Sequence, residues 1–288
     1  MSRQWWTYLT WAGLGLCVAF GLYFIPIDAY LHFATAAKSP KPFLIAESMA
    51  FKGMPNVGHY GINTTMHGLG HPEDYWEGAL SPTTFPNEQK TRSITRKFKN
   101  DRLYYVDIEH FVFEDHLLKD NANKLTAIAK WIRSEKPDLR FGFYGLMPIT
   151  TYWNRDENWR KRNRSLAGVA QYVDYVLPDL YTYYPDRRGW MAQAEDSIAE
   201  ARKYKKPVYA FLMPLYHPGG QMGIEGQPIP GDYWRLQLET MYRLADGIVI
   251  WAWYPEKDWK LIASDTDPNN WWCQTVEFIR QQQAAAPR

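Results

Sequence analysis

The chain has 288 residues, of which 46% are hydrophobic and 22% charged, a mixture that is typical of folded globular proteins and excludes disordered and collagen-like classes. Its 33 basic and 31 acidic side chains nearly balance, which argues against a protein that works by neutralising nucleic-acid phosphates. The two cysteines, Cys17 and Cys273, cannot form a disulfide framework and do not have the spacing of zinc ligands. Aromatic residues make up 16% of the chain, and such a content suits a site that stacks against hydroxylated ligands.

The N-terminal segment is predicted to be a membrane anchor. No charged residue occurs from Tyr8 to Ile27, and a helix needs about 20 apolar residues to cross a bilayer. Arg3 precedes this run, so the positive-inside rule places the remaining chain outside the cytoplasm, in the periplasm or at the cell surface. A cleavable signal peptide is the alternative, because residues 34–36 resemble a small-residue cleavage site, but the long apolar run favours a retained anchor. We therefore expect an anchor or uncleaved signal at residues 1–37 and one domain at residues 38–288.

Short apolar runs alternate with segments of helical period along this domain. The runs predicted to be strands are Phe43–Glu47, His59–Asn63, Leu103–Glu109, Phe141–Met147, Val173–Tyr181, Pro207–Met213 and Gly247–Trp253. Between them, Leu125, Ile128 and Ile132 share one helix face, and so do Trp234 and Met241. Such alternation implies parallel pairing through crossover helices. We predict an α/β fold, a TIM-like (β/α) barrel of seven or eight parallel strands, preceded by the N-terminal transmembrane helix.

Polar and aromatic residues gather at the predicted carboxyl ends of these strands, where β/α barrels carry their functional residues. Tyr144 and Tyr181 occur there, together with five residues that we expect to bind substrate: Trp251, Trp253, Tyr216, Asn63 and Glu47. Carboxylates, an amide and aromatic rings in one place are typical of carbohydrate sites. We expect no cofactor, and no metal either, because the histidines at 59, 67 and 71 lie among glycines without a ligand spacing.

Asp107 and Glu109 are the most specific signal. Residues two apart on a strand share a face, so both carboxylates are expected to project toward the barrel axis. Two neighbouring carboxylates disfavour simultaneous ionisation, which raises the pKa of one of them until it holds a proton near neutral pH. Such a group can protonate the oxygen of a glycosidic bond. A solvated strand end or a metal site is the alternative reading of this pattern.

Two carboxylates on one strand do not readily flank a scissile bond from opposite sides, as ordinary retaining or inverting pairs must. Substrate assistance resolves the difficulty, because the oxygen of a 2-acetamido group on the sugar then attacks the anomeric carbon. The protein supplies one acid and one carboxylate that orients the amide.

Several short motifs resemble the hyaluronidase family of glycosidases. They occur in the family's order. His67–Pro72 is faintly similar to its Arg-Leu-Gly-x-Tyr-Pro stretch, and Val106–Phe111 is similar to its Asp-x-Glu strand. Phe141–Pro148 is similar to its Gly-Phe-Tyr-Gly-x-Pro strand, Leu177–Tyr181 to its Pro-Ser-Ile-Tyr segment, and Ile248–Trp251 to its closing strand. Together they span most of the predicted barrel, which makes the ordered set more specific than any one motif.

The resemblance implies that Glu109 is the proton donor and then the base, and that Asp107 positions the acetamido group. It also implies that Tyr144 and Tyr181 line the site and that Trp251 forms a wall beneath the reacting sugar. The family's structural disulfides and cysteine-rich module have no counterpart here, and residues 110–111 depart from its pattern, which argues against hyaluronan itself as the substrate.

These observations predict an exported, membrane-anchored glycoside hydrolase, a hyaluronidase-like endo-N-acetylhexosaminidase with a retaining, substrate-assisted mechanism. Its expected partners are a polysaccharide containing acetamido sugars and the membrane, through residues 8–27, with no nucleic acid. One alternative is an inactive glycan-binding barrel of a cell-envelope or exopolysaccharide system. Another is a glycosidase with two separate carboxylates, the second supplied by Glu47 or Glu256.

Overall fold

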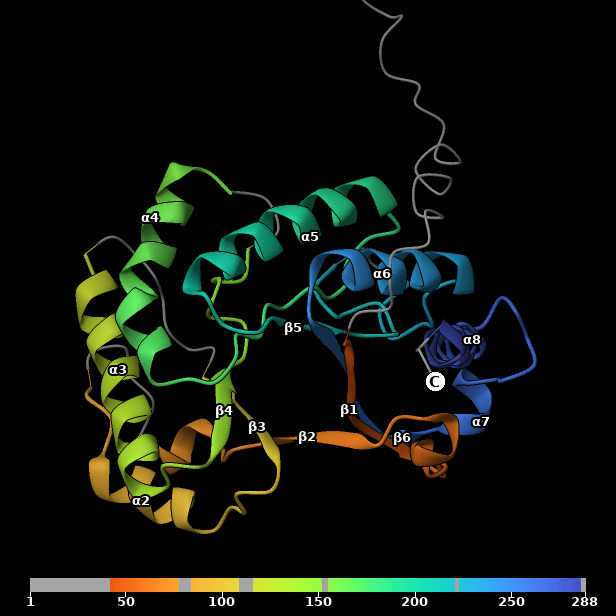
Figure 1. Cartoon of the computed structure of the whole chain (residues 1–288). Helices are drawn as coiled ribbons and strands as arrows, with labels where there is room; N and C mark the ends of the chain where they lie inside the picture. The colour runs from red at the N-terminus through yellow and green to blue at the C-terminus, as the bar shows by residue number, and fades with distance from the viewer. Residues whose placement is uncertain (1–41, 78–83, 109–115, 152–154, 221–222, 286–288) are drawn as a thin grey trace, which may run out of the picture. The chain divides into compact units, whose positions relative to one another are not determined.

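The computed structural model describes residues 42–77, 84–108, 116–151, 155–220 and 223–285 (Figure 1). The chain divides into two compact units, Met1–Ser39 and Pro40–Arg288, and the described residues all belong to the second. Within them, no helix has both the length and the apolar character needed to cross a membrane. The membrane segment predicted at residues 8–27 lies outside the described residues and stays a prediction.

The second unit is built on a sheet of six parallel strands, which confirms the parallel α/β fold. The strands are β1 (Leu44–Lys52), β2 (Thr64–Gly68), β3 (Leu103–Val106), β4 (Arg140–Phe143), β5 (Tyr209–Leu212) and β6 (Gly247–Asp258). They pair in the order β4-β3-β2-β1-β6-β5, and every pairing is parallel.

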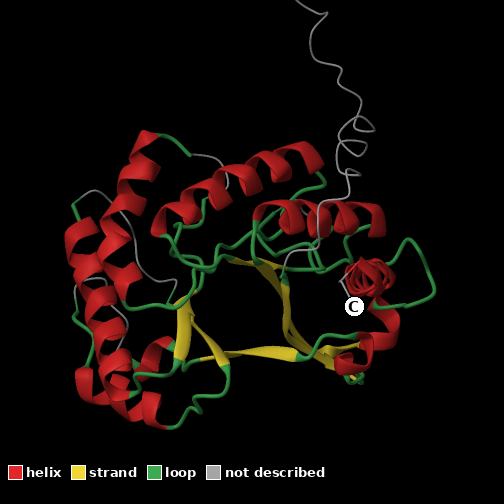
Figure 2. Ribbon diagram, viewed as in Figure 1, coloured by secondary structure: helices red, strands yellow, loops and turns green. Residues whose placement is uncertain are grey.

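A further extended segment connects the two edges of this sheet. Parallel bridges join Leu177 to Tyr144, just after β4, and join Val176 and Asp179 to β5 through Val208 and Phe211. Residues 176–179 thus lie between β4 and β5 and complete a ring of parallel pairings, with the helices outside the strands (Figure 2).

Helices follow most of the strands and cover the ring from outside (Figure 1). They are α2 (Glu88–Arg96), α3 (Leu118–Glu135), α4 (Glu157–Ser165), α5 (Arg187–Ala201), α6 (Gly231–Leu244), α7 (Trp259–Ile262) and α8 (Trp271–Ala285), with short 3-10 helices η1 (Val57–Tyr60), η2 (Pro72–Asp74), η3 (Leu166–Gln171) and η4 (Arg202–Tyr204). The predicted apolar stripes of α3 and α6 are buried in the core, Leu125 and Ile128 on one helix and Trp234 and Met241 on the other. The 3.6-residue period of these segments is therefore explained by packing against the strands.

The prediction of a strand at His59–Asn63 is wrong. The Asn56 side chain accepts a hydrogen bond from Gly58 N and starts the 3-10 helix η1, which Gly61 ends in the left-handed region with φ 96°. The strand begins only at Thr64, so Asn63 precedes β2 and lies at its amino end. Asn63 is therefore not at the carboxyl end of a strand, where we expected it to bind substrate.

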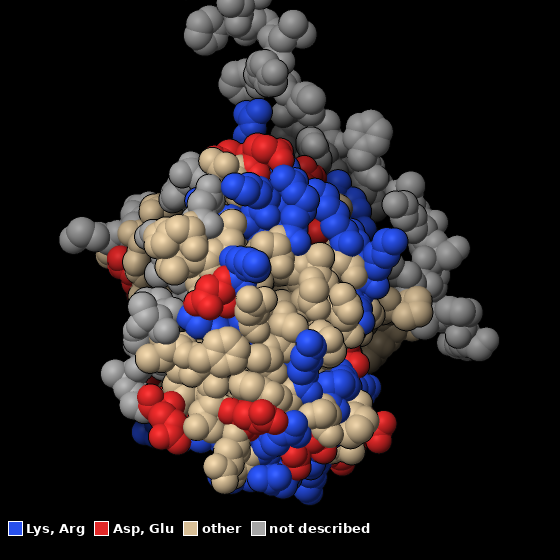
Figure 3. All heavy atoms as spheres, turned by 90° about the vertical axis from the view of Figure 1, so that its left-hand side faces the viewer, with Lys and Arg blue, Asp and Glu red and all other residues tan. Residues whose placement is uncertain are grey.

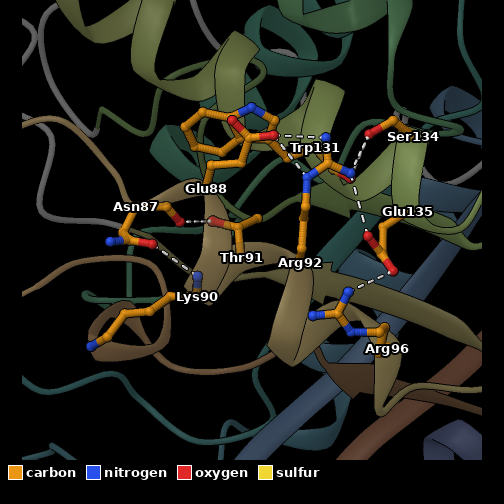
Figure 4. A network of polar contacts seen from close by, with 9 residues as sticks. All are labelled: Asn87, Glu88, Lys90, Thr91, Arg92, Arg96, Trp131, Ser134 and Glu135. Carbon is orange, nitrogen blue, oxygen red and sulfur yellow. Dashed lines mark hydrogen bonds and ion pairs between the residues drawn. The ribbon is translucent and has the colours of Figure 1, made fainter.

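Polar contacts tie α2 to α3 on the outer surface (Figure 4). The Arg92 guanidinium bonds Glu88 at 2.8 Å on its own helix and reaches Ser134 at 2.8 Å and Glu135 at 3.3 Å on α3. Arg96 also pairs with Glu135, at 3.1 Å. Exposed pairs of this kind contribute little to stability because water screens them, so they orient the two helices more than they hold the fold together.

A close approach inside the ring predicts the effect of one substitution. A Cβ at Gly142 would lie 2.5 Å from Tyr175 O and 2.9 Å from the Tyr175 ring, whose hydroxyl bonds the Tyr104 backbone. Gly142→Ala is therefore expected to destabilise the fold by about 1–3 kcal/mol, or roughly 3–10 °C in Tm. Gly168→Ala is the matched control, because a Cβ there meets nothing within 4 Å. Thermal unfolding of both variants checks this, and equal Tm values would contradict it.

Candidate active site

The inner face of the ring can be assigned from contacts across it. The rings of Tyr105 on β3 and Phe211 on β5 lie 5.3 Å apart between centroids, although the two strands sit well apart in the sheet. Both side chains therefore point inward. Since side chains alternate along a strand, Asp107, two residues after Tyr105, continues the inner face at the carboxyl end of β3. Its charge also acts on buried Tyr75, because the Asp107 carboxylate, after burial and Asp74, helps raise the pKa of that phenol well above its usual range.

Aromatic side chains on or just after β3, β4, β5, β6 and the 176–179 segment meet on this inner face. The Tyr144 ring lies 4.9 Å from Phe211 and 6.4 Å from Tyr105. It also lies 5.9 Å from Tyr181, which stacks on Trp251 at 5.5 Å with an interplanar angle of 22°. Tyr144 and Tyr181 are buried and Trp251 is half-buried. The structure thus brings Tyr144, Tyr181 and Trp251, three of the predicted site residues, into one contact chain at the carboxyl ends of the strands.

Glu109 lies outside the described residues. Its partner Asp107 is the last inward-facing residue that the structure describes on this strand. The assignment of Glu109 as the acid therefore continues to rest on the sequence.

The structure adds one further acid, Asp179, to the inner face. Asp179 is 7% exposed and pairs with Phe211 across the 176–179 bridge, so it also lies on the inner face. Tyr181 N donates a 3.0 Å hydrogen bond to its Oδ1, which fixes the backbone that carries the Tyr181 ring. A Cβ built on Gly145 would lie 3.9 Å from the Asp179 Cβ, which places this carboxyl beside the turn after Tyr144. In the sequence, the position of Asp179 on the inner face is indicated by its spacing of two residues from Tyr181, since residues two apart on a strand share a face.

Trp253 and Tyr216 differ sharply in exposure. β1 and β6 are longer than the other strands and stay paired up to Lys52 and Asp258. Trp253 lies on this extension, on the same face as Trp251, and is 65% exposed. Tyr216 is only 6% exposed and packs in the core. Trp253 is therefore free to meet a ligand in solution, whereas Tyr216 serves mainly to pack the loop after β5.

Glu47 faces away from the aromatic cluster. Its Oε1 accepts a 2.6 Å hydrogen bond from Thr65 Oγ1, and its Oε2 accepts one of 2.9 Å from Met49 N. Glu47 and Thr65 are register partners and share their face with His67, whose ring lies 5.9 Å from Tyr104. That face is opposite the inward residues of β2 and β3, so Glu47 lies on the outer side of β1. Its hydrogen bonds stabilise the β1–β2 pairing.

No group of three or more His, Cys, Asp or Glu side chains that could hold a metal ion occurs in the described ranges.

Basic side chains gather over the region of α4, in the upper part of the face shown in Figure 3. Basic side chains on α4 and on other segments form ion pairs with carboxylates: Arg155 with Asp196 and Arg164 with Glu157, both at 2.9 Å, Arg202 with Asp246, and Lys203 with Glu200 at 2.5 Å. Much of this charge therefore serves ion pairs within and between neighbouring helices and loops.

Comparisons with known proteins give only distant similarity. No family model matches the chain, and no curated protein matches it either. Among solved structures, the chain resembles fungal β-1,4-galactanases (12% identity, 68% of this chain and 79% of the other, TM-score 0.45). It also resembles active domain 2 of a chitinase from Pyrococcus furiosus (10% identity, 87% and 98%, TM-score 0.45). A third is an endo-β-1,3-glucanase from Amycolatopsis mediterranei in complex with laminaritriose (12% identity, 82% and 97%, TM-score 0.44).

These neighbours are glycoside hydrolases, but TM-scores below 0.5 leave the function to be argued from the residues of the site. The resemblance to the hyaluronidase family is carried by the sequence motifs alone.

Proposed function

We propose that this protein is an exported, membrane-anchored glycoside hydrolase that cleaves a polysaccharide containing N-acetylhexosamine. The observation that carries the proposal is the convergence of Tyr144, Tyr181 and Trp251 on the inner face of the ring, at the end where Asp107 closes β3. Parallel barrels carry their chemistry at this end. Carboxyls beside tyrosine hydroxyls and an indole provide proton transfer, hydrogen bonding and a flat apolar wall for a sugar ring.

The proposed reaction is retaining and substrate-assisted. Glu109 donates its proton to the glycosidic oxygen while the acetamido oxygen of the same sugar attacks the anomeric carbon, so the glycosidic bond breaks and a cyclic oxazolinium ion forms. Asp107 orients the acetamido group and stabilises its positive charge. The Glu109 carboxylate then removes a proton from water, which opens the ring at the anomeric carbon and restores both the acetamido group and the protonated acid.

Trp251 and the two tyrosines serve this reaction as the wall and the hydrogen-bonding groups of the sugar site. Trp251 offers a half-buried indole against which the apolar face of the sugar packs. The hydroxyls of Tyr144 and Tyr181 are proposed to hydrogen-bond the acetamido oxygen and hold it against the anomeric carbon.

Asp179 favours a second candidate, a glycosidase with two separate carboxylates. It is buried on the inner face and lies on the far side of β4 from Asp107 in the ring. In that case Asp179 acts as a nucleophile and forms a covalent glycosyl ester, or acts as a base toward water, and no acetamido group is needed.

An activity screen separates these candidates. The full-length protein, kept in a mild detergent, is incubated with chondroitin, hyaluronan, chitin oligosaccharides and peptidoglycan, and with β-glucan and galactan as polymers without acetamido groups. We expect new reducing ends only from acetamido polymers. Cleavage of β-glucan or galactan would favour the two-carboxylate mechanism, and binding without turnover of any polymer would favour an inactive glycan-binding barrel.

A further inference from the structure

Two rings that the proposed reaction does not use extend the aromatic contact chain. His217, in the loop after β5, lies 5.3 Å from the Tyr181 ring with an interplanar angle of 22°. Tyr183 lies 4.7 Å from His217 on the other end of the same chain of contacts. Trp251, Tyr181, His217 and Tyr183 therefore form one row of rings that starts at the proposed sugar wall.

The imidazole of His217 is held in place by its backbone and its neighbours. His217 N donates to Thr182 O at 2.8 Å, which pairs the loop after β5 with the segment that carries Tyr183. The two loops also touch more closely nearby, because a Cβ on Gly220 would lie 2.1 Å from Tyr183 O. A ring fixed in this way loses little freedom when it binds a ligand.

The hydrogen bond at Nδ1 of His217 determines whether Nε2, the other ring nitrogen, donates or accepts. Nδ1 lies 2.7 Å from Pro218 O, and since a carbonyl oxygen can only accept, Nδ1 carries the hydrogen. In the neutral ring, Nε2 is then an acceptor, and burial lowers the pKa of His217, which favours this neutral form. The side chain is half-buried, and within the described part of the chain Nε2 has no hydrogen-bond partner.

We propose that His217 and Tyr183 form a second sugar-binding subsite, in which Nε2 of His217 accepts a hydrogen bond from a sugar hydroxyl of a polymer that also occupies the Trp251 site. Nδ1 is occupied by the Pro218 carbonyl, so Nε2 is the ring nitrogen left to bond a ligand. Sugar hydroxyls are donors of the required kind. This inference rests on the proposed function and deepens it, because it makes the substrate a chain of sugars bound across neighbouring subsites.

The test combines two variants at His217 and one control variant at His59 with oligosaccharides of different length. His217→Phe keeps a ring in the row and removes the acceptor, and we expect KM for long chitin oligosaccharides to rise about 3- to 10-fold, the effect of one neutral hydrogen bond. Short oligosaccharides that reach only the Trp251 site are expected to keep their KM. His217→Gln, whose amide oxygen can accept, is expected to restore part of the affinity. His59→Phe, at an exposed histidine on η1, is the matched control and is expected to behave as the native protein.

Direct binding distinguishes failure of the subsite from failure of the proposed function. Calorimetric titration of long chitin oligosaccharides into Glu109→Gln, with and without His217→Phe, is expected to show the same 3- to 10-fold loss. Such a loss supports the subsite even where the native protein shows no turnover. Equal affinity in the two proteins overturns it, as does a fall in kcat for short and long oligosaccharides alike, which would place His217 in the reaction itself.

Discussion

Replacing Glu109 by Gln is expected to lower kcat for the acetamido polysaccharide by about 10²- to 10⁴-fold while leaving its affinity nearly unchanged. Glutamine has almost the same shape but carries no acidic proton, so it cannot protonate the leaving oxygen, a contribution of this size in general acid catalysis. Asp107→Asn is expected to lower kcat by a similar factor, because its neutral amide no longer stabilises the positive charge on the acetamido group. Steady-state rates and calorimetric affinities of both variants check this.

Two further variants test whether the loss of activity is specific to Glu109. Glu256→Gln removes an exposed carboxyl near the end of β6, away from the inner face, and is expected to leave kcat unchanged. Asp179→Asn is expected to lower kcat less than Glu109→Gln, because the acetamido oxygen is the proposed nucleophile. Full turnover by Glu109→Gln would refute the acid assignment, and complete loss of turnover only in Asp179→Asn would move the chemistry to Asp179.

Tyr181→Phe is expected to lower kcat about 10²-fold with a change in Tm no larger than that of Tyr204→Phe. The substitution keeps the ring that stacks between Trp251 and His217, so the packing of the site is preserved. It removes the hydroxyl that we propose to hold the acetamido oxygen in line with the anomeric carbon, and misplacement of a reacting group can cost about 10²-fold in rate. Rates and thermal unfolding measured on the same preparation separate an effect on catalysis from an effect on folding.

Tyr204→Phe is the matched control for Tyr181→Phe. The Tyr204 hydroxyl donates to Asn163 O at 2.8 Å and joins η4 to α4 outside the ring. Its removal is expected to cost about 1 kcal/mol of stability and no activity. If both variants lost activity in proportion to their loss of stability, Tyr181 would have only a structural role.

Much of the ring could be predicted from the sequence because its strands are short apolar runs and its helices carry stripes of period 3.6. β2 was the exception. Its sequence from Thr64 to Gly68 contains one large apolar residue, Met66, so it lacks the apolar pattern by which the other strands were found. β1 and β6 extend beyond their predicted ends because they pair with each other up to Lys52 and Asp258, a tertiary effect that neither segment encodes alone.

The same pairing explains which site residues were predicted and which were not. The sequence predicts that Glu47 ends its strand, but β1 continues past it to Lys52, and alternation turns the Glu47 side chain outward. Tyr144 and Tyr181 were found because they follow real strand ends. His217 was missed because its position depends on a loop held by Thr182 and Pro218, contacts that no local pattern reveals.

The configuration at the anomeric carbon of the first product, read together with a search for a covalent sugar on the protein, tests substrate assistance most directly. Proton NMR during cleavage of the acetamido polymer by the full-length protein reads this configuration before the free sugar equilibrates. Attack by the acetamido oxygen followed by attack of water inverts the centre twice, so the product is predicted to keep the configuration of the bond that was cut. An inverted product, or a covalent sugar ester found on a carboxyl of the protein by mass spectrometry, would contradict it.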